Sequence, residues 1–246
     1  MKAIVSCDSN PFYHDFWPLV KDVWKNHLDI DPFLIYVSDE VGDEENVHYI
    51  KPIPGIPIYL QAQLARIYFT QLFENEICLV SDIDMIPICK NFFDKQKIID
   101  NVKKDSFYHL NPERREFGQL PLCYYCAHGS TYKKLFDNMS WEEFLNFILE
   151  KDFNVDKTNY RLPQRLSGNN LWFSDELFLH TQISYKNIPI KKSNTLIHPR
   201  KRIDREQILG LNYLDLFNGE IIDVHLPRPY SNFKESTNKI LFALGI

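Results

Sequence analysis

The stretch from Glu76 to Pro87, with the sequence EICLVSDIDMIP, constrains the fold of this chain more than any other. Four apolar residues, 77–80, are followed by the carboxylates of Asp82 and Asp84, after which apolar residues resume. A continuous apolar run this short is typical of a strand buried on both faces, in a sheet covered by helices. We therefore predict a central strand that ends at the two acids.

Two neighbouring carboxylates at the end of a buried strand need a positive partner. In an extended backbone, side chains two positions apart point the same way, which places Asp82 and Asp84 side by side. Burial and the like charge both oppose ionisation, and a divalent cation relieves both effects. Mg²⁺ and Mn²⁺ prefer oxygen ligands and commonly bind carboxylates together with phosphate oxygens. The pattern thus indicates a metal–diphosphate site; the alternative is turn chemistry or solvated charge.

Short apolar strands alternate with helical patterns in the first half of the chain. The predicted strands are Lys2–Cys7, Phe33–Val37 and Val47–Ile50, and the predicted helices are residues 16–24, with Pro18 in the first turn, and Tyr59–Phe73. Such alternation with short connections gives an α/β, Rossmann-like fold whose central sheet is mainly parallel and has helices on both faces. Ligands of such sheets bind beyond the carboxyl ends of the strands. We therefore expect Ser6–Asn10, Ser38–Asp39 and Asp82–Asp84 to lie along one edge.

The pattern beyond Pro87 is less regular. It predicts strands at Asp105–Leu110 and Leu120–Ala127, a helix at Trp141–Leu149, and a substrate-facing loop in the polar stretch Asp152–Asn170. The sequence contains no internal repeat and no clear domain linker. We expect a single domain, with a nucleotide-binding half at 1–110 and an acceptor-binding half at 111–246.

Arg66 lies on the apolar face of the predicted helix before the two acids. It shares that face with Ala62, Phe69 and Phe73, at positions i−4, i+3 and i+7. A guanidinium on an apolar face needs an anionic partner, and the two acids of the next strand or a bound diphosphate would supply one. The alternative is an arginine that extends along the surface to reach water.

Asp175 and Glu176 follow Ser174 at the predicted start of a helix. Ser174 fits the N-cap position, and acids in the first turn complement the helix dipole. The functional interpretation is an acid pair that faces the cleft and takes a proton from a substrate hydroxyl. Both interpretations remain open at the level of sequence.

A second apolar strand pattern, from Ile221, ends in His225 and is followed by Arg228. A lone histidine at a strand end is usually structural. Beside a carboxylate metal site, however, His225 is a candidate metal ligand and Arg228 a candidate phosphate-binding residue. The basic run 200–202 is either a solvated loop or a segment that closes over phosphates.

Composition narrows the class of protein. The 246 residues are 44% hydrophobic and 25% charged, as in ordinary globular proteins, and the net charge of −5 argues against general nucleic-acid binding. No apolar segment approaches the ~20 residues of a membrane span, and the N-terminus lacks a signal-peptide pattern, so we expect a cytoplasmic protein. Five cysteines fit reduced thiols better than a disulfide framework, and we expect Cys123 and Cys126 to be buried in the core.

With these motifs identified, the chain resembles the GT-A fold nucleotide-sugar glycosyltransferases. SCDSNPFY at Ser6–Tyr13 is similar to the nucleotide-binding turn after the first strand in the glycogenin-like and galactosyltransferase branch. The segment from Ala65 to Pro87 is similar to the helix and D-x-D strand of that branch. HLPRPY at His225–Tyr230 resembles its C-terminal H-x-x-G-x-x-K-P-W element, with the glycine missing, arginine in place of lysine, and shorter spacing.

The resemblance implies specific roles for these residues. A UDP- or GDP-sugar would be the donor and a saccharide or glycan the acceptor, with no nucleic-acid partner. Mn²⁺ or Mg²⁺ would be held by Asp82, Asp84 and His225. The implied donor-binding residues are Ser6, Asp8, Asn10, Tyr13, Asp39, Arg66, Asp82 and Arg228.

The resemblance allows either stereochemical course at the anomeric carbon, and of the two we favour inversion. Inverting GT-A enzymes use an acid at a helix start as the base, which would be Asp175, with Glu176 as its substitute. In the retaining glycogenin-like branch, Asp175 would only position the substrate. Two rival functions remain. One is a haloacid-dehalogenase-type phosphatase with Asp82 as nucleophile, but that motif ends in Thr or Val where this chain has Ile86. The other is a non-catalytic sugar- or nucleotide-binding module.

Overall fold

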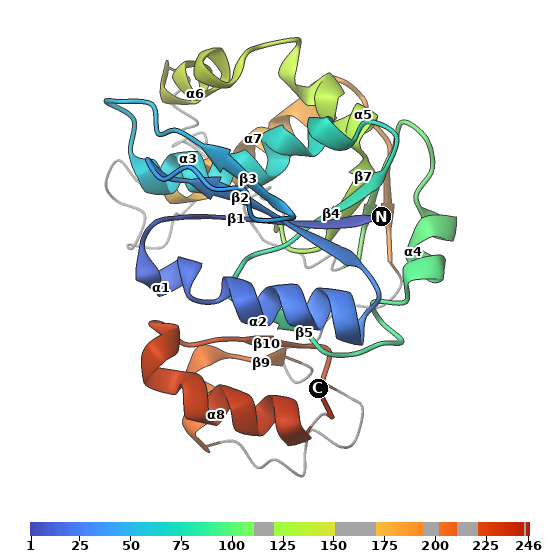
Figure 1. Cartoon of the computed structure of the whole chain (residues 1–246). Helices are drawn as coiled ribbons and strands as arrows, with labels where there is room; N and C mark the ends of the chain where they lie inside the picture. The colour runs from blue at the N-terminus through green and yellow to red at the C-terminus, as the bar shows by residue number, and fades with distance from the viewer. Residues whose placement is uncertain (111–120, 151–170, 194–201, 211–220, 244) are drawn as a thin grey trace, which may run out of the picture.

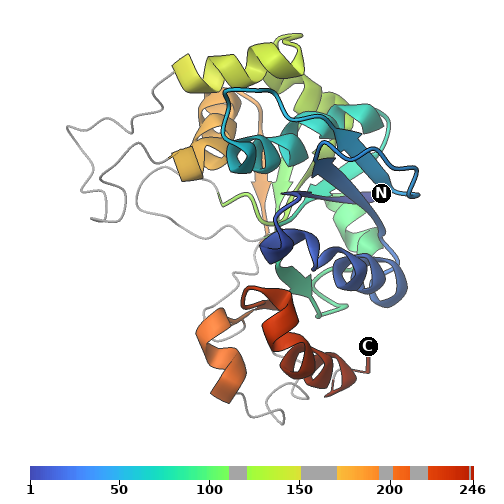
Figure 2. The same ribbon diagram turned by 60° about the vertical axis from the view of Figure 1, so that its left-hand side comes forward.

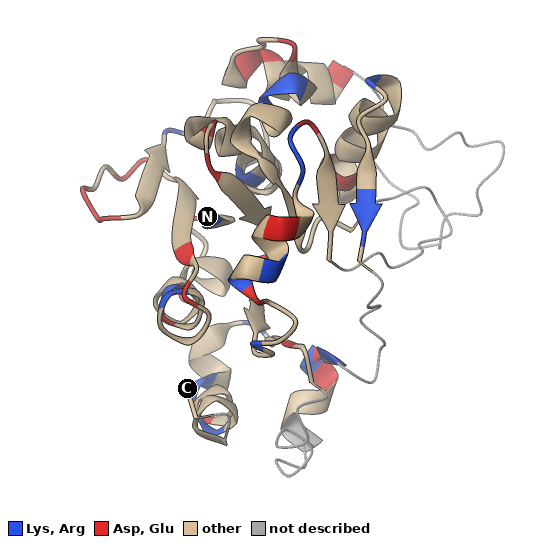
Figure 3. Ribbon diagram, turned by 90° about the vertical axis from the view of Figure 1, so that its right-hand side faces the viewer, with Lys and Arg blue, Asp and Glu red and all other residues tan. Residues whose placement is uncertain are grey.

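The structure is a computed structural model that describes residues 1–110, 121–150, 171–193, 202–210, 221–243 and 245–246 (Figure 1). Within these residues, no helix is both long enough and apolar enough to cross a bilayer. Basic and acidic residues are interspersed along the described ribbon (Figure 3).

A seven-stranded sheet forms the centre of the fold. Its strand order is β3-β2-β1-β4-β7-β6-β8. The strands are β1 (Lys2–Asp8), β2 (Asp31–Val37), β3 (Val47–Ile50), β4 (Ile77–Val80), β6 (Phe107–His109), β7 (Tyr125–His128) and β8 (Ile190–Lys192). The pairs β1–β2, β2–β3, β1–β4 and β6–β8 are parallel, whereas β7 runs antiparallel to β4 and to β6. The predicted α/β fold with a mainly parallel central sheet is confirmed.

Helices cover both faces of this sheet (Figures 1 and 2). Successive side chains of β1 alternate between two apolar cores, with Val5 in one and Ile4 in the other. The first core contains residues from α2 (Trp17–Asp22), the π-helical turn η1 (Val23–His27), α4 (Lys95–Asn101) and α8 (Tyr230–Ala243). The second contains residues from α3 (Ile58–Tyr68), α5 (Gly129–Lys133), α6 (Trp141–Glu150) and α7 (Ser174–Tyr185).

The helices begin and end close to the predicted positions. Pro18 lies in the first turn of α2, where its missing N–H leaves no hydrogen bond unmade. The helix predicted to reach Phe73 ends at Tyr68 and continues as the 3₁₀ helix η2 (Phe69–Phe73). At the start of α6, Ser140 and Glu143 form a reciprocal capping box.

Strands in the second half are shorter than predicted. The segment predicted from Asp105 forms a strand only from Phe107, and the one predicted from Leu120 forms a strand only from Tyr125. Asp105, two residues before β6, and Tyr124, directly before β7, have φ angles of 60° and 71°, so the chain leaves the extended conformation at both positions. The predicted loop at 152–170 lies outside the described residues.

A second, three-stranded sheet positions the C-terminal part of the chain. It has the order β5-β10-β9 and comprises β5 (Met85–Pro87), β9 (Arg202–Ile203) and β10 (Asp223–His225). Antiparallel pairing of β10 with β5 places His225 opposite Met85, and the Leu226 N–H donates to the Asp84 carbonyl at 2.8 Å. This sheet and α8 lie together on the side of α2 (Figures 1 and 2). This pairing brings His225 next to the two acids, although it lies 140 positions from its partner Met85.

Candidate functional site

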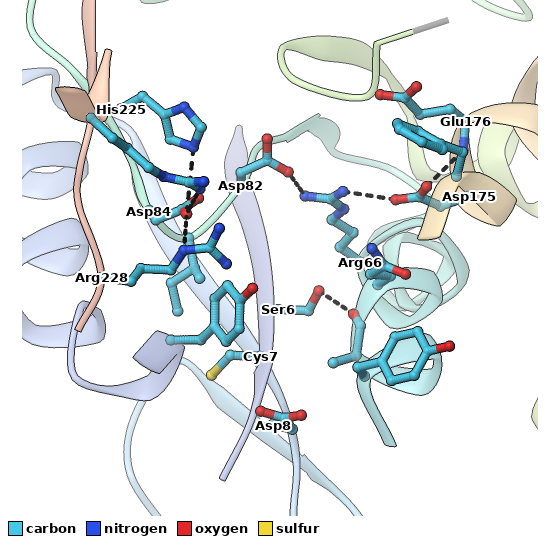
Figure 4. A pocket seen from close by; sticks show the side chains of 17 residues that line it. Ser6, Cys7, Asp8, Arg66, Asp82, Asp84, Asp175, Glu176, His225 and Arg228 are labelled. Carbon is cyan, nitrogen blue, oxygen red and sulfur yellow. Dashed lines mark hydrogen bonds and ion pairs between the residues drawn. The ribbon is translucent and has the colours of Figure 1, made fainter. Parts of the chain in front are cut away.

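A pocket of about 510 Å³ lies where β1 and β4 end. Residues 6–8 from the end of β1 and 82–84 after β4 line it, together with side chains from α3, α7 and the loop after β10 (Figure 4). Parallel strands present their carboxyl ends at the same edge of a sheet, which is why these residues meet. The prediction that the polar ends of the first and fourth strands share one edge is confirmed.

Arg66 pairs with two carboxylates in this pocket. Its Nη1 contacts Asp82 Oδ1, and its Nη2 donates to Asp175 Oδ2 at 2.8 Å. The side chains of Arg66 and Asp175 are only 11% and 3% exposed, whereas that of Asp82 is 38% exposed. The anionic partner predicted for Arg66 is therefore present, and it is a pair of acids from two different elements.

Burial and charge compete within this triad. Burial opposes the positive charge of Arg66, but Asp82 and Asp175 outweigh it and raise the pKa of the guanidinium. At Asp82, burial also acts against the charge, yet Arg66 lowers the pKa of this carboxyl. At Asp175, burial is the largest effect and raises the pKa despite Arg66. Of the two acids, Asp175 takes up a proton more readily.

Asp84 belongs to a separate cluster. Its carboxylate, 6% exposed, pairs with Arg205 Nη2 at 2.5 Å, and it lies 3.5 Å from both His225 Nε2 and Arg228 Nε. The other ring nitrogen, His225 Nδ1, lies 2.9 Å from Asp204 Oδ1. Burial opposes protonation of His225, but hydrogen bonding and charge from Asp84 raise the pKa of the imidazole.

The two acids do not point the same way, as an extended backbone would require. Ile83 and Asp84 form a turn between the end of β4 and the start of β5. Asp82 therefore faces Arg66, while Asp84 faces His225 and Arg228 (Figure 4). The extended geometry predicted for this stretch is wrong, because the backbone turns at Ile83 and Asp84 before β5 begins.

The donor set at Asp84 fits a hard divalent cation. With His225 Nδ1 fixed by Asp204, its Nε2 faces Asp84, as in metal-bound histidines held by a second carboxylate. Mg²⁺-type sites commonly use one or two protein ligands and complete their shell with phosphate and water oxygens. In the described part of the chain, no three His, Cys, Asp or Glu side chains form a ready-made metal cluster. The structure therefore brings Asp84 and His225 together, and it holds Asp82 with Arg66.

The predicted donor-binding residues at the ends of β1 and β2 fall into two groups. Ser6, Asp8 and Tyr13 line the pocket, and the Arg228 guanidinium stacks on the Tyr13 ring at 4.7 Å. Asn10 instead caps α1 (Pro11–His14), where its side chain accepts from the Phe12 N–H at 3.0 Å. Asp39 is exposed and is not among the residues that line the pocket. Local turn chemistry thus accounts for the position of Asn10.

The predicted acid pair at the start of α7 also lines the pocket. Ser174 is the first helical residue, and Phe173 takes the N-cap position without a side-chain hydrogen bond, so the predicted serine cap is wrong. Asp175 Oδ1 accepts from the Glu176 N–H at 2.8 Å, so both oxygens of Asp175 are engaged. Figure 4 shows the Glu176 carboxylate turned away from Arg66. The two acids thus occupy different surroundings.

Several pocket residues were not anticipated from the sequence. They are Tyr59, Ala62, Gln63, Phe173 and Arg205, whereas Cys7 and Ile83 lie within the predicted ranges Ser6–Asn10 and Asp82–Asp84. Burial raises the pKa of the Cys7 thiol, so the thiol keeps its proton and forms an apolar part of the pocket wall. Arg205 follows a basic run without any strand-end signal, and the pairing of β10 with both β9 and β5 brings it near Asp84.

The predicted buried thiols are confirmed. Cys123 and Cys126 are both buried, and both are free cysteines, as are the other three.

No protein-family model and no curated protein sequence matches this chain. Among solved structures, it is similar to the galactosyltransferase LgtC in complex with donor and acceptor sugar analogues, with 12% identity and a TM-score of 0.49, over 100% of this chain and 95% of that one. It is similar to a glycosyltransferase involved in glycosylation of the major capsid of PBCV-1, with 11% identity and a TM-score of 0.48, over 98% of both chains. A third is a mutant Drosophila β-1,4-galactosyltransferase 7 in complex with manganese, UDP-Gal and xylobiose, with 10% identity and a TM-score of 0.45, over 94% of this chain and 72% of that one. Each of these three solved structures is of a glycosyltransferase.

Proposed function

We propose that this chain is a metal-dependent glycosyltransferase, which transfers a sugar from a nucleoside-diphosphate sugar to a hydroxyl of a saccharide acceptor. The observation that carries the proposal is the convergence of Asp84, His225 and Arg228 with the end of β1 in one pocket of about 510 Å³. An acid, an imidazole and a guanidinium in this arrangement suit a cation-bound diphosphate. The pocket volume lies within the range of small-molecule sites.

In this proposal, Asp84 and His225 hold Mn²⁺ or Mg²⁺. When bound, the ion would stabilise the negative charge that grows on the diphosphate as the sugar leaves. Arg228, which also contacts Asp84, would bind a phosphate oxygen, and its stacking on Tyr13 would fix its orientation. Asp82 remains a proposed ligand that reaches the ion or the ribose with the oxygen that does not face Arg66.

The end of β1 would receive the nucleoside. Asp8 is 6% exposed and its Oδ1 accepts from the Asn10 N–H at 3.0 Å, which holds the loop after β1 in shape. The Ser6 hydroxyl donates to the Ala62 carbonyl and ties β1 to α3. Both contacts pre-organise the wall on which the ribose and base would lie.

The proposed transfer inverts the anomeric centre, with Glu176 as the proton acceptor. A base must reach the hydroxyl that it deprotonates. Both acids line the pocket, but Asp175 is 2% exposed and binds Arg66, whereas Glu176 is partly exposed. We therefore assign Asp175 the positioning of Arg66, and Glu176 the role of base. In a retaining transfer, neither acid would act as the base.

A thermal-shift screen of UDP-, GDP- and other nucleotide sugars, with and without Mn²⁺, tests the proposal. We expect a metal-dependent rise in melting temperature with one donor class, followed by sugar release or transfer with that donor. Binding without turnover would favour a non-catalytic module. Hydrolysis of a generic phosphoester, without any response to nucleotide sugars, would favour the phosphatase.

A further inference from the structure

One carboxylate oxygen in the pocket faces three nitrogen-bearing side chains. Asp84 Oδ2 lies 2.5 Å from Arg205 Nη2, 3.5 Å from His225 Nε2 and 3.5 Å from Arg228 Nε. The Asp84 side chain is 6% exposed, so water contributes little to its solvation. Its charge is therefore balanced by side chains of the protein.

Arg205 makes the shortest of these contacts. Its Nε also donates to the Leu226 carbonyl at 3.2 Å, which holds the guanidinium against the acid. A metal–carboxylate bond of the Mg²⁺ type is only about 2.1 Å long. A cation ligated by Asp84 Oδ2 would therefore compete with Arg205 for the same oxygen, and the two positive charges would repel each other.

Arg202, three residues earlier, forms a more firmly held ion pair. Its Nε and Nη2 bind both oxygens of Asp223 at 2.8 and 2.7 Å, and that aspartate is completely buried. Arg205 binds one oxygen, and its side chain is 29% exposed. Arg205 therefore has one hydrogen bond to its acid to break, where Arg202 has two.

Charge balance indicates when Arg205 would move. A metal ion alone adds positive charge to a cluster that already contains Arg205 and Arg228. A metal ion together with a nucleoside diphosphate adds charges of opposite sign, and the phosphate oxygens offer both arginines a new partner. Binding of the metal ion together with the nucleoside diphosphate is therefore more favourable than binding of the metal ion alone.

We propose that Arg205 is a further diphosphate-binding residue, which neutralises Asp84 in the ligand-free pocket and moves to the nucleoside diphosphate when the metal ion takes its place. Metal and nucleotide then bind cooperatively, because the diphosphate draws Arg205 away from Asp84 and the two ligands balance each other's charge. This inference rests on the proposed function.

Binding of Mn²⁺ to the full chain, followed by the electron paramagnetic resonance signal of the free ion, tests the inference without any turnover. It is measured with Mn²⁺ alone and with excess UDP or GDP, for the wild type, Arg205→Gln and Arg205→Lys. Lys95→Gln, which removes a surface pair with Asp29, is the matched control. Melting curves establish that each variant is folded.

In the wild type, we expect weak binding of Mn²⁺ alone and a roughly tenfold or greater gain with one of the nucleotides. Arg205→Gln should bind Mn²⁺ alone more tightly and show a smaller nucleotide-dependent gain, while Arg205→Lys, which keeps the charge, should retain weak binding of Mn²⁺ alone. If Arg205→Gln matches the wild type in both measurements, the inference is overturned and the proposed function stands. If the wild type binds neither Mn²⁺ nor a nucleotide, both are overturned.

Discussion

Arg66 Nη2 donates a 2.8 Å hydrogen bond to Asp175 Oδ2, across 109 positions of the chain. The same guanidinium contacts Asp82 through Nη1, so one arginine of α3 joins the end of β4 to the start of α7. The acids proposed to bind the donor and the acids proposed to face the acceptor are therefore connected through a single buried charge. A displacement of Asp82 or of Asp175 would therefore shift the other acid through Arg66.

Arg66→Gln should destabilise the fold by roughly 3–5 kcal/mol, because it leaves the buried Asp175 carboxylate without its partner. Arg66→Gln combined with Asp175→Asn should recover part of this loss, since the orphaned charge is then absent. Urea unfolding of the two single variants and the double variant measures the coupling. Strictly additive losses would show that Arg66 and Asp175 do not stabilise each other.

Glu176→Gln should lower kcat by at least ~100-fold while leaving donor affinity near the wild-type value, because a base acts on the transition state. Asp175→Asn should instead reduce both stability and donor binding, since it loosens Arg66. Steady-state kinetics and calorimetric donor titration separate the two effects. NMR of the product anomer reports the stereochemistry, and retention would remove Glu176 from the role of base.

Asp204→Ala should weaken Mn²⁺ binding by roughly 10-fold or more, because Asp204 fixes the tautomer and orientation of His225. His225→Ala should weaken it further, since a ligand is lost. Titration of Mn²⁺ in the presence of the cognate nucleotide compares the variants. Equal affinities for Asp204→Ala and the wild type would exclude this orienting role.

His109 should make the fold sensitive to acid. Its ring is 1% exposed and stacks on Tyr125 with centroids 3.9 Å apart, and burial lowers the pKa of the imidazole to about 3. Below the ordinary histidine pKa of about 6.5, the unfolded chain binds a proton that the folded chain rejects. The free energy of unfolding therefore falls as pH falls, by about 1.4 kcal/mol per pH unit between these two values.

His109→Phe removes this term while retaining the ring stack. Urea unfolding at pH 6.5 and at pH 5 should show a smaller loss of stability in His109→Phe than in the wild type, by about 2 kcal/mol. Identical losses in the two proteins would mean that the imidazole is protonated inside the fold.

The sequence was sufficient to predict features that depend on local pattern. The apolar run before Asp82 predicted a buried central strand, and β4 is buried at all four positions. The face of α3 that carries Arg66 predicted an anionic partner, which was found in Asp82. The strand pattern before His225 predicted a second strand end, which is β10.

Features that depend on long-range packing were not predictable in the same way. Arg205 lies 121 positions from Asp84, and their contact requires β9, β10 and β5 to pair in one small sheet. Periodicity describes each strand but not its neighbours. The separate orientation of Asp82 and Asp84 depends on the same sheet, because β5 begins directly after the turn at Asp84.

The proposed function depends most on Asp84, which would hold the cation that carries the diphosphate of a sugar donor. Its most direct test is calorimetric titration of the donor from the screen into the wild type and Asp84→Asn, each with Mn²⁺ and with EDTA. We predict that the wild type binds the donor only with Mn²⁺, and that Asp84→Asn binds it at least ~100-fold more weakly while melting within a few degrees of the wild type. Equal, metal-dependent affinities in the two proteins would contradict it.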